Sequence, residues 1–256
     1  MGNKILALLL LIFFISSCAL GVKVPGNRFQ TSETSGKKGH FRVGAGEAGM
    51  SKVTLTPASD SVYINEKNPE ISNAESSLIV DGRYAATRRL DLGILYYHDS
   101  TLSYLLKWQF LEGRFLQDKK YSMALSVSSG YSSDYANGVN SLRRTKSKIE
   151  YINSDLGLIA GIRPYSNFLI YGGIFDMFMT YEGQQTIDGD RRLYDGSIDS
   201  ETITLGLEIA AEERWKIQIE GARSLIRTSA SKKIQDSYDK AKIVHNIGAK
   251  LNFDFQ

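Results

Sequence analysis

Apolar and polar residues alternate along most of the chain after residue 40. The last segment shows the pattern best, because one face of it is apolar and the other polar. The apolar positions are Ala241, Ile243, Ile247, Ala249, Leu251, Phe253 and Phe255, and the polar positions are Lys240, Lys242, Asn246, Lys250, Asn252 and Asp254. A period of two residues places alternate side chains on opposite faces of a β-strand. The pattern therefore predicts an all-β protein.

The alternation returns often enough to predict ten strands. We expect them at residues 41–49, 76–86, 89–98, 101–112, 121–131, 148–163, 167–183, 200–212, 214–228 and 239–255. Short turns alternate with longer polar connections, which lie around residues 50–75, 132–147, 184–199 and 229–238. Transmembrane β-barrels show this asymmetry, with short periplasmic turns and longer surface loops. The arrangement favours an antiparallel up-and-down barrel.

Alternation alone does not say which face is buried, so a soluble barrel or β-sandwich with an apolar core is the alternative. The polar face carries charges of both signs, which can pair with one another in a narrow lumen. We assign to it Arg42, Asp81, Arg83, Asp91, Lys107, Asp155, Arg163, Asp176, Glu208, Glu220 and Lys250. The apolar face carries aromatic residues near strand ends, as an interfacial girdle does: Tyr96, Trp108, Tyr121, Tyr131, Tyr181 and Trp215. Both features favour a transmembrane barrel with a polar, charge-packed lumen.

The first 17 residues have the pattern of an export signal. Lys4 precedes an apolar stretch from Ile5 to Ile15, which has the length of a signal-peptide core and is shorter than a membrane-spanning helix. The run from Ile15 to Cys18 resembles the bacterial lipobox. That resemblance implies lipidation of Cys18 and cleavage before it and, because Ala19 is not an aspartate, delivery to the outer membrane. An ordinary cleaved signal with a chance cysteine is the alternative.

The segment after the signal is rich in Gly, Pro, Ser and Thr, a composition typical of flexible linkers. We therefore expect a lipoprotein signal peptide at 1–17, a lipid-anchored flexible periplasmic linker at 18–40 and an outer-membrane β-barrel at 41–256. An even number of strands leaves both ends of the barrel on the side of the short turns. The lipid anchor is accordingly expected on the periplasmic side.

The end of the chain resembles the signal that the outer-membrane barrel assembly machinery reads. The matching positions are Asn246, Gly248, Leu251 and Phe253, although this chain continues to Gln256 where the family ends on the aromatic residue. With the pattern over residues 40–256, the resemblance is to bacterial outer-membrane β-barrels as a class. It implies outer-membrane lipids as surroundings, and the lipoprotein-sorting and barrel-assembly machineries as partners in transit.

Composition and motifs point away from most enzyme classes. The 256 residues carry a formal net charge of +3 and a pI near 8.8, too mild for a nucleic-acid partner. Nucleotide-binding, metal-binding and nucleophile-elbow motifs are missing, and we expect no cofactor. His98 and Ser100 resemble the His–Ser pair of outer-membrane lipid A deacylases, in which histidine deprotonates serine. Ordinary turn chemistry is the alternative for this stretch.

Two charged groups lie in the expected long loops. Asp188, Asp190, Asp195 and Asp199 lack the spacing of a calcium loop and indicate a solvated segment. A basic cluster is a candidate contact for lipopolysaccharide phosphates. Its members are Arg143, Arg144, Lys146 and Lys148.

Three functions remain open. We favour a non-enzymatic, non-conducting barrel with a structural or surface-interaction role in the cell envelope. A narrow pore is a weaker alternative, because side chains nearly fill a barrel of about this size. A lipid A ester hydrolase using His98 and Ser100 is the third. The pattern does not specify an oligomeric state.

Overall fold

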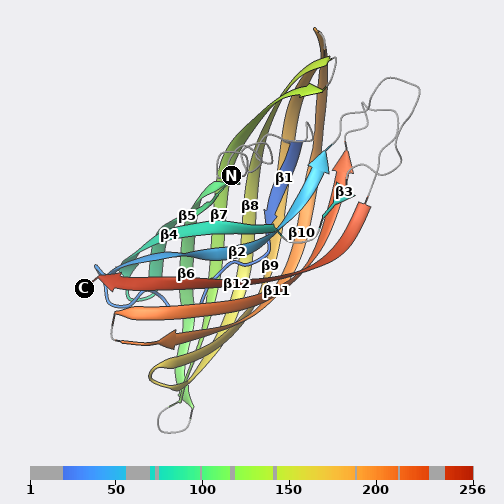
Figure 1. Ribbon diagram of the computed structural model, residues 1–256. Coiled ribbons are helices and arrows are strands. Elements are labelled where there is room, and N and C mark those ends of the chain that lie inside the picture. The colour runs from blue at the N-terminus through green and yellow to red at the C-terminus, as the bar shows by residue number, and fades with distance from the viewer. Residues whose placement is uncertain are drawn as a thin grey trace, which may run out of the picture.

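The computed structural model describes residues 20–55, 70–72, 75–98, 100–115, 119–140, 143–187, 189–212, 214–230 and 240–255. Ten strands form a closed antiparallel barrel, as predicted (Figure 1). They are β2 (Phe41–Leu55), β4 (Glu75–Thr87), β5 (Leu90–Tyr97), β6 (Leu102–Phe115), β7 (Lys119–Asn140), β8 (Arg143–Tyr165), β9 (Phe168–Ile187), β10 (Asp190–Ala210), β11 (Trp215–Ala230) and β12 (Lys240–Phe255). The ring closes because β2 pairs with both β4 and β12. Two short strands, β1 (Leu20–Pro25) and β3 (Glu70–Ile71), also pair with β2.

The two ends of the barrel differ. At the short-turn end, the wall begins at Phe41 and finishes at Phe255, which are paired, and tight turns lie at residues 88–89 and 166–167. The opposite end, which we call the long-hairpin end, is where the long β7–β8 and β9–β10 hairpins turn. The C-terminal tip of β12 marks the short-turn end in Figure 1.

Side chains of the wall alternate between the outside and the lumen. In β10, Leu205 is exposed and the adjacent Thr204 is buried. Each wall strand presents large apolar residues outward, among them Phe41, Leu78, Leu92, Leu106, Val127, Leu158, Ile174, Leu205, Ile217 and Leu251. These residues form an apolar belt around a lumen that contains charged groups. This arrangement is that of a transmembrane barrel and the reverse of a soluble one.

Strand β9 departs from the predicted assignment of its faces. Asp176, expected in the lumen, is exposed, and Tyr181, expected in the girdle, is buried. The inward face of β9 is apolar here, with Phe175, Met177 and Met179 buried. The outward face also carries apolar residues, among them Ile174 and Phe178, so alternation does not distinguish the two faces of this strand. The other girdle residues are exposed as expected: Tyr96, Trp108, Tyr121, Tyr131 and Trp215.

Strands β7 to β10 continue well beyond the apolar belt. The β7–β8 pairing runs on to Asn140 and Arg143, and the β9–β10 pairing to Ile187 and Asp190. The connections expected at 132–147 and 184–199 are therefore mostly strand. The prediction missed them because their faces lack apolar alternation, whereas backbone pairing does not require it.

The chain before β2 lies inside the barrel. Strand β1 runs antiparallel to the end of β2, from Leu20 opposite Leu55 to Pro25 opposite Met50. Leu20 is therefore at the long-hairpin end. The chain then passes to the short-turn end, where the Gly39 N–H donates to the carbonyl oxygen of Ala85 (2.9 Å). The described part of the segment 18–40 is thus not the flexible linker that its composition predicts, and it does not stay on the short-turn side.

The lumen has two layers. Near the long-hairpin end, β1, the end of β2 and β3 make a small sheet inside the wall, which supplies Val22, Val24, Val53 and Ile71 to an apolar core. The wall contributes Ile149, Tyr151, Met177, Met179, Tyr181, Ile198, Ile226 and Val244. The layer towards the short-turn end is charged, as predicted for the lumen. The apolar layer was not predicted.

Candidate functional site in the plugged lumen

The segment from Gly26 to Ser35 fills the charged layer, and we call it the plug. It begins where β1 ends, with Gly26 N–H donating to the Gly49 carbonyl oxygen (3.0 Å) and Gly49 N–H donating to Asn27 Oδ1 (2.9 Å). Phe29 has a φ of 49°, in the left-handed region that bulky residues rarely adopt. Its carbonyl oxygen accepts a hydrogen bond from Arg83 Nη2 (3.0 Å). The surrounding wall therefore holds this backbone conformation in place.

Arg28 ties the plug to β8. Its side chain is buried, and its Nε donates to Asp155 Oδ2 (2.6 Å). The guanidinium also donates to the Pro25 carbonyl and lies 5.8 Å from the ring centroid of Phe175. A buried charge without a partner is strongly destabilising. The carboxylate of Asp155 therefore offsets the cost of burying the Arg28 guanidinium.

Glu220 on β11 binds the backbone of the plug. Its Oε1 accepts hydrogen bonds from the N–H groups of Arg28 (2.6 Å) and Phe29 (3.2 Å). Asn27 Nδ2 donates to the Glu220 carbonyl oxygen (2.7 Å). Hydrogen bonds to an ionised carboxylate are among the stronger ones. One wall residue thus fixes three consecutive plug residues.

A buried ionic cluster from β4 and β12 surrounds Phe29. Asp81 accepts hydrogen bonds from Arg83 Nε (2.6 Å) and Lys250 Nζ (2.8 Å). Lys250 Nζ lies 5.5 Å from the centroid of the Phe29 ring, a cation–π contact. Two cations therefore share one carboxylate, and the ring and carbonyl group of Phe29 complete their surroundings.

The last residues of the plug, Glu33 to Ser35, contact wall residues near the short-turn end. Ser35 donates to Asp91 Oδ2 from its N–H (2.9 Å) and its hydroxyl (3.0 Å), and Asp91 is 3.4 Å from Lys107 Nζ. Glu33 Oε2 pairs with Arg163 Nη2 at 2.7 Å. The plug therefore joins the ion pairs of the wall along its length.

At the short-turn end of the barrel, wall residues also form ion pairs with one another. Arg42 Nε donates to Asp254 Oδ1 (2.5 Å), and Arg42 is 3.7 Å from Glu208. Lys216 Nζ is 2.6 Å from Asp254 Oδ2. Charges of both signs thus neutralise one another, as predicted for the lumen. The wall half of this network was assigned from the sequence, whereas Arg28, Glu33 and the plug backbone were missed, because they lie in a segment without strand periodicity.

The structure does not bring His98 and Ser100 together. The His98 side chain is exposed beside Tyr96, whose hydroxyl is 3.5 Å from His98 Nδ1. Ser100 is buried, and its hydroxyl donates to the Lys23 carbonyl oxygen of β1 (3.1 Å). Histidine and serine therefore lie on opposite sides of the wall. The geometry of a general base beside its nucleophile is not formed.

The other predicted groups lie only partly among the described residues. Cys18 lies outside the described residues, as do Asp188 and the side chains of Arg143, Arg144 and Asp190. In β8, Lys148 pairs with Glu150 at 2.5 Å. Within the described ranges, no group of three or more His, Cys, Asp or Glu residues could hold a metal ion.

The predicted assembly-signal residues lie in β12, the strand that closes the ring. Leu251 is exposed on the belt, Asn246 is buried, and the ring centroid of Phe253 lies 4.7 Å from that of Trp215. Gly248 lies close to the plug. A Cβ there would lie 2.6 Å from the Glu47 carbonyl oxygen and 2.8 Å from Phe29 Cζ.

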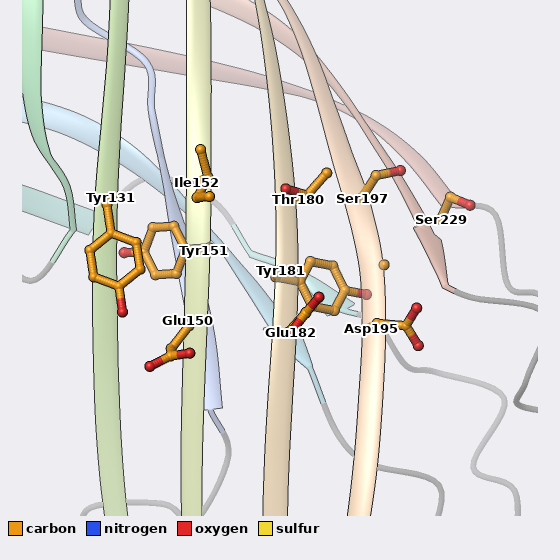
Figure 2. A pocket seen from close by; sticks show the side chains of 11 residues that line it. Tyr131, Glu150, Tyr151, Ile152, Thr180, Tyr181, Glu182, Asp195, Ser197 and Ser229 are labelled. Carbon is orange, nitrogen blue, oxygen red and sulfur yellow. The ribbon is translucent and has the colours of Figure 1, made fainter.

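A cleft of about 490 Å³ lies on the extension of β7 to β11 (Figure 2). Three carboxylates form a row across neighbouring strands, with Glu150 opposite Glu182 and Glu182 opposite Asp195. Like charges in facing positions are destabilising, and Lys148 offsets part of that cost. The row gives this part of the extension a negative charge. The cleft is lined by Tyr131, Glu150, Tyr151, Ile152, Thr180, Tyr181, Glu182, Asp195, Gly196, Ser197 and Ser229.

Comparison with solved structures shows a similarity of fold only. The chain is similar to the outer-membrane protease OmpT from Escherichia coli, with 10% identity, a TM-score of 0.45, and coverage of 92% of this chain and 96% of that one. It is also similar to Ail, the attachment invasion locus protein of Yersinia pestis, with 10% identity, a TM-score of 0.35, and coverage of 85% and 99%. No family model matches the sequence, and no curated protein matches it.

The wall itself decides the class of protein. An apolar belt, exposed aromatic residues and an ion-paired lumen are combined in a closed antiparallel ring. The chain is a transmembrane β-barrel. In the part of the chain that the structure describes, no helix has the length and apolarity needed to span a bilayer.

Proposed function

We propose that this protein is a non-conducting outer-membrane barrel, anchored by lipid at Cys18, with a structural or surface-interaction role. The observation that carries the proposal is the filled lumen. Asn27, Arg28, Phe29, Gln30, Thr31, Ser32 and Ser35 are all buried inside the wall. A barrel whose interior is occupied by its own chain offers the outer surface for interactions.

The long-hairpin extension is the part that suits such a role. In outer-membrane barrels the short turns face the periplasm and the long connections face outward. The extension of β7 to β10 therefore projects from the cell surface in this proposal. Exposed tyrosines such as Tyr131 and Tyr135, and the acidic row at Glu150 and Glu182, are available there for contacts.

The separation of His98 from Ser100 favours a non-enzymatic role over the hydrolase alternative. Ser100 supports β1 through its hydroxyl, which is a structural use of the side chain. The lipid anchor is supported by the lipobox-like run that ends at Cys18. Acyl chains on the cysteine would hold the N-terminus in the bilayer, because each buried methylene contributes about 0.8 kcal/mol.

Conductance in planar bilayers tests the proposal. The wild-type protein should give no stable channels. A variant with residues 20–35 replaced by glycine and serine, which removes both β1 and the plug from the lumen, should conduct, provided that its gel mobility remains heat-modifiable and so reports a closed barrel. Stable channels from the wild type would overturn the proposal. A closed but silent variant would show that the plug is not what seals the lumen.

A further inference from the structure

We infer that the N-terminal segment is threaded through its own barrel, so that the acyl chains on Cys18 enter the outer, cell-surface leaflet. They cross the rim where it is lowest, at the tops of β4, β5 and β6. This inference rests on the proposed lipid anchor and on the outward orientation of the long hairpins. It reverses the expectation of a periplasmic anchor that strand parity suggested.

The direction of β1 determines at which end of the barrel the described chain begins. Pairing of Leu20 with Leu55 and of Pro25 with Met50 places the start of the described chain at the end of β2 remote from Phe41. An extended chain spans at most about 3.6 Å per residue, so the two residues from Leu20 back to Cys18 reach about 7 Å. The hydrocarbon core is about 30 Å thick. The periplasmic leaflet is therefore out of reach of Cys18.

The rim of the barrel at the long-hairpin end differs in height from strand to strand. The β7–β8 hairpin rises far above the belt, but β5 has only 8 residues and the chain returns in β6 from Leu102. Tyr96 and His98 are exposed at this turn, as amphipathic side chains are at a membrane interface. The outer-leaflet headgroups therefore meet the barrel close to its upper edge on this side.

Contacts place β1 beside that low rim. The Lys23 carbonyl oxygen accepts the Ser100 hydroxyl at 3.1 Å, and Lys23 Nζ is 3.7 Å from Glu75 Oε2 at the top of β4. Residues 20–22 remain paired in β1, so Cys18 lies within about 7 Å of the paired end of that strand. One leaflet of the hydrocarbon core is about 15 Å deep. We infer that from this position the acyl chains turn over the rim into the outer leaflet.

An epitope tag between Ala19 and Leu20, with Cys18 retained, tests the threading. Antibody should bind the tag on intact cells as strongly as on permeabilised cells. The matched control carries the same tag between Arg88 and Arg89 in a short turn, where the signal on intact cells should be lost. A tag after Ala19 that is detected only after permeabilisation overturns the inference.

A second measurement covers the case in which the tag disturbs β1. Val24 and Ser51 are cross-strand partners and both buried. The double variant Val24→Cys/Ser51→Cys should form an intramolecular disulfide on mild oxidation. Failure of the disulfide to form in heat-modifiable, closed barrels overturns the pairing and hence the threading.

Metabolic labelling with a palmitate analogue separates this inference from the proposed anchor. Label should enter the wild type and be lost in Cys18→Ser. An unlabelled wild type would refute the lipid anchor, and with it the acyl chains in the outer leaflet. The tag and the disulfide would then still report whether the N-terminal segment runs through the barrel.

Discussion

Individual charged residues hold the plug, and their partners lie far away in the sequence. Arg28 meets Asp155 and its backbone meets Glu220, across separations of 127 and 192 residues. The sequence allowed Asp155 and Glu220 to be assigned to the lumen, because strand parity fixes the face of each. It gave no partner for them, since parity says nothing of a segment inside the ring.

Asp155→Asn should destabilise the folded barrel by about 3–5 kcal/mol, because it leaves the Arg28 guanidinium buried without its counter-charge. Urea unfolding in detergent or lipid, followed by loss of heat-modifiable mobility, measures the change. Arg227→Gln is the control. It breaks a pair with Glu201 of similar length (2.6 Å) in which both side chains are about half exposed, and exposed pairs contribute little. Equal effects of the two variants would contradict the role given to the buried pair.

At the scale of the element, the sequence predicted the ten wall strands and their order, because a two-residue period is a strong signal wherever one face meets lipid. The prediction weakened where that contrast disappears. In β9 both faces carry apolar residues, so the alternation did not identify the lumen face, and Asp176 and Tyr181 were assigned to the wrong sides. Beyond the belt, both faces of β7 and β8 are mixed, and strand was taken for loop.

Strand β10 allows the belt to be tested with one substitution at two positions. Leu205 and Leu193 share a face and have the same exposed fraction, 68%. Leu205 is in the belt, and Leu193 is near the tip of the extension. Leu205→Arg should cost about 2–4 kcal/mol, as cations do on the lipid face near the middle of a bilayer. Leu193→Arg should leave stability in lipid unchanged. Equal costs in the same unfolding assay would argue against lipid contact at Leu205.

For the whole molecule, the decisive feature is a chain that passes through its own ring. The sequence did not show this, because the plug has the Gly, Ser and Thr content of a linker and owes its order to the wall around it. The ring is closed by only seven residue pairs between β2 and β12, from Phe41 with Phe255 to Glu47 with Ala249. Beyond that seam, β1 takes the place of β12 beside β2.

Gly248→Val should impair closure of the barrel around the plug. The added atoms would overlap Phe29 and the Glu47 carbonyl oxygen, and overpacking of this kind costs about 1–3 kcal/mol. The fraction of heat-modifiable protein in membranes should fall. Gly221→Val is the control, since the nearest atom to a Cβ there is 3.9 Å away. If Gly248→Val closes as well as Gly221→Val, the plug does not pass close to Gly248.

The short seam also sets the timing of assembly. The residues that close it are among the most distant in the chain, and contacts between distant residues form slowly. The N-terminal segment is adjacent to β2 in the sequence and can lie along it while the remaining strands are added one after another. A ring closed beforehand would have to admit this segment, together with the acyl chains of the proposed anchor, past an apolar core and a packed ionic layer. The segment must therefore be in place before the first and last strands meet, so that it serves as an internal template around which the barrel assembles.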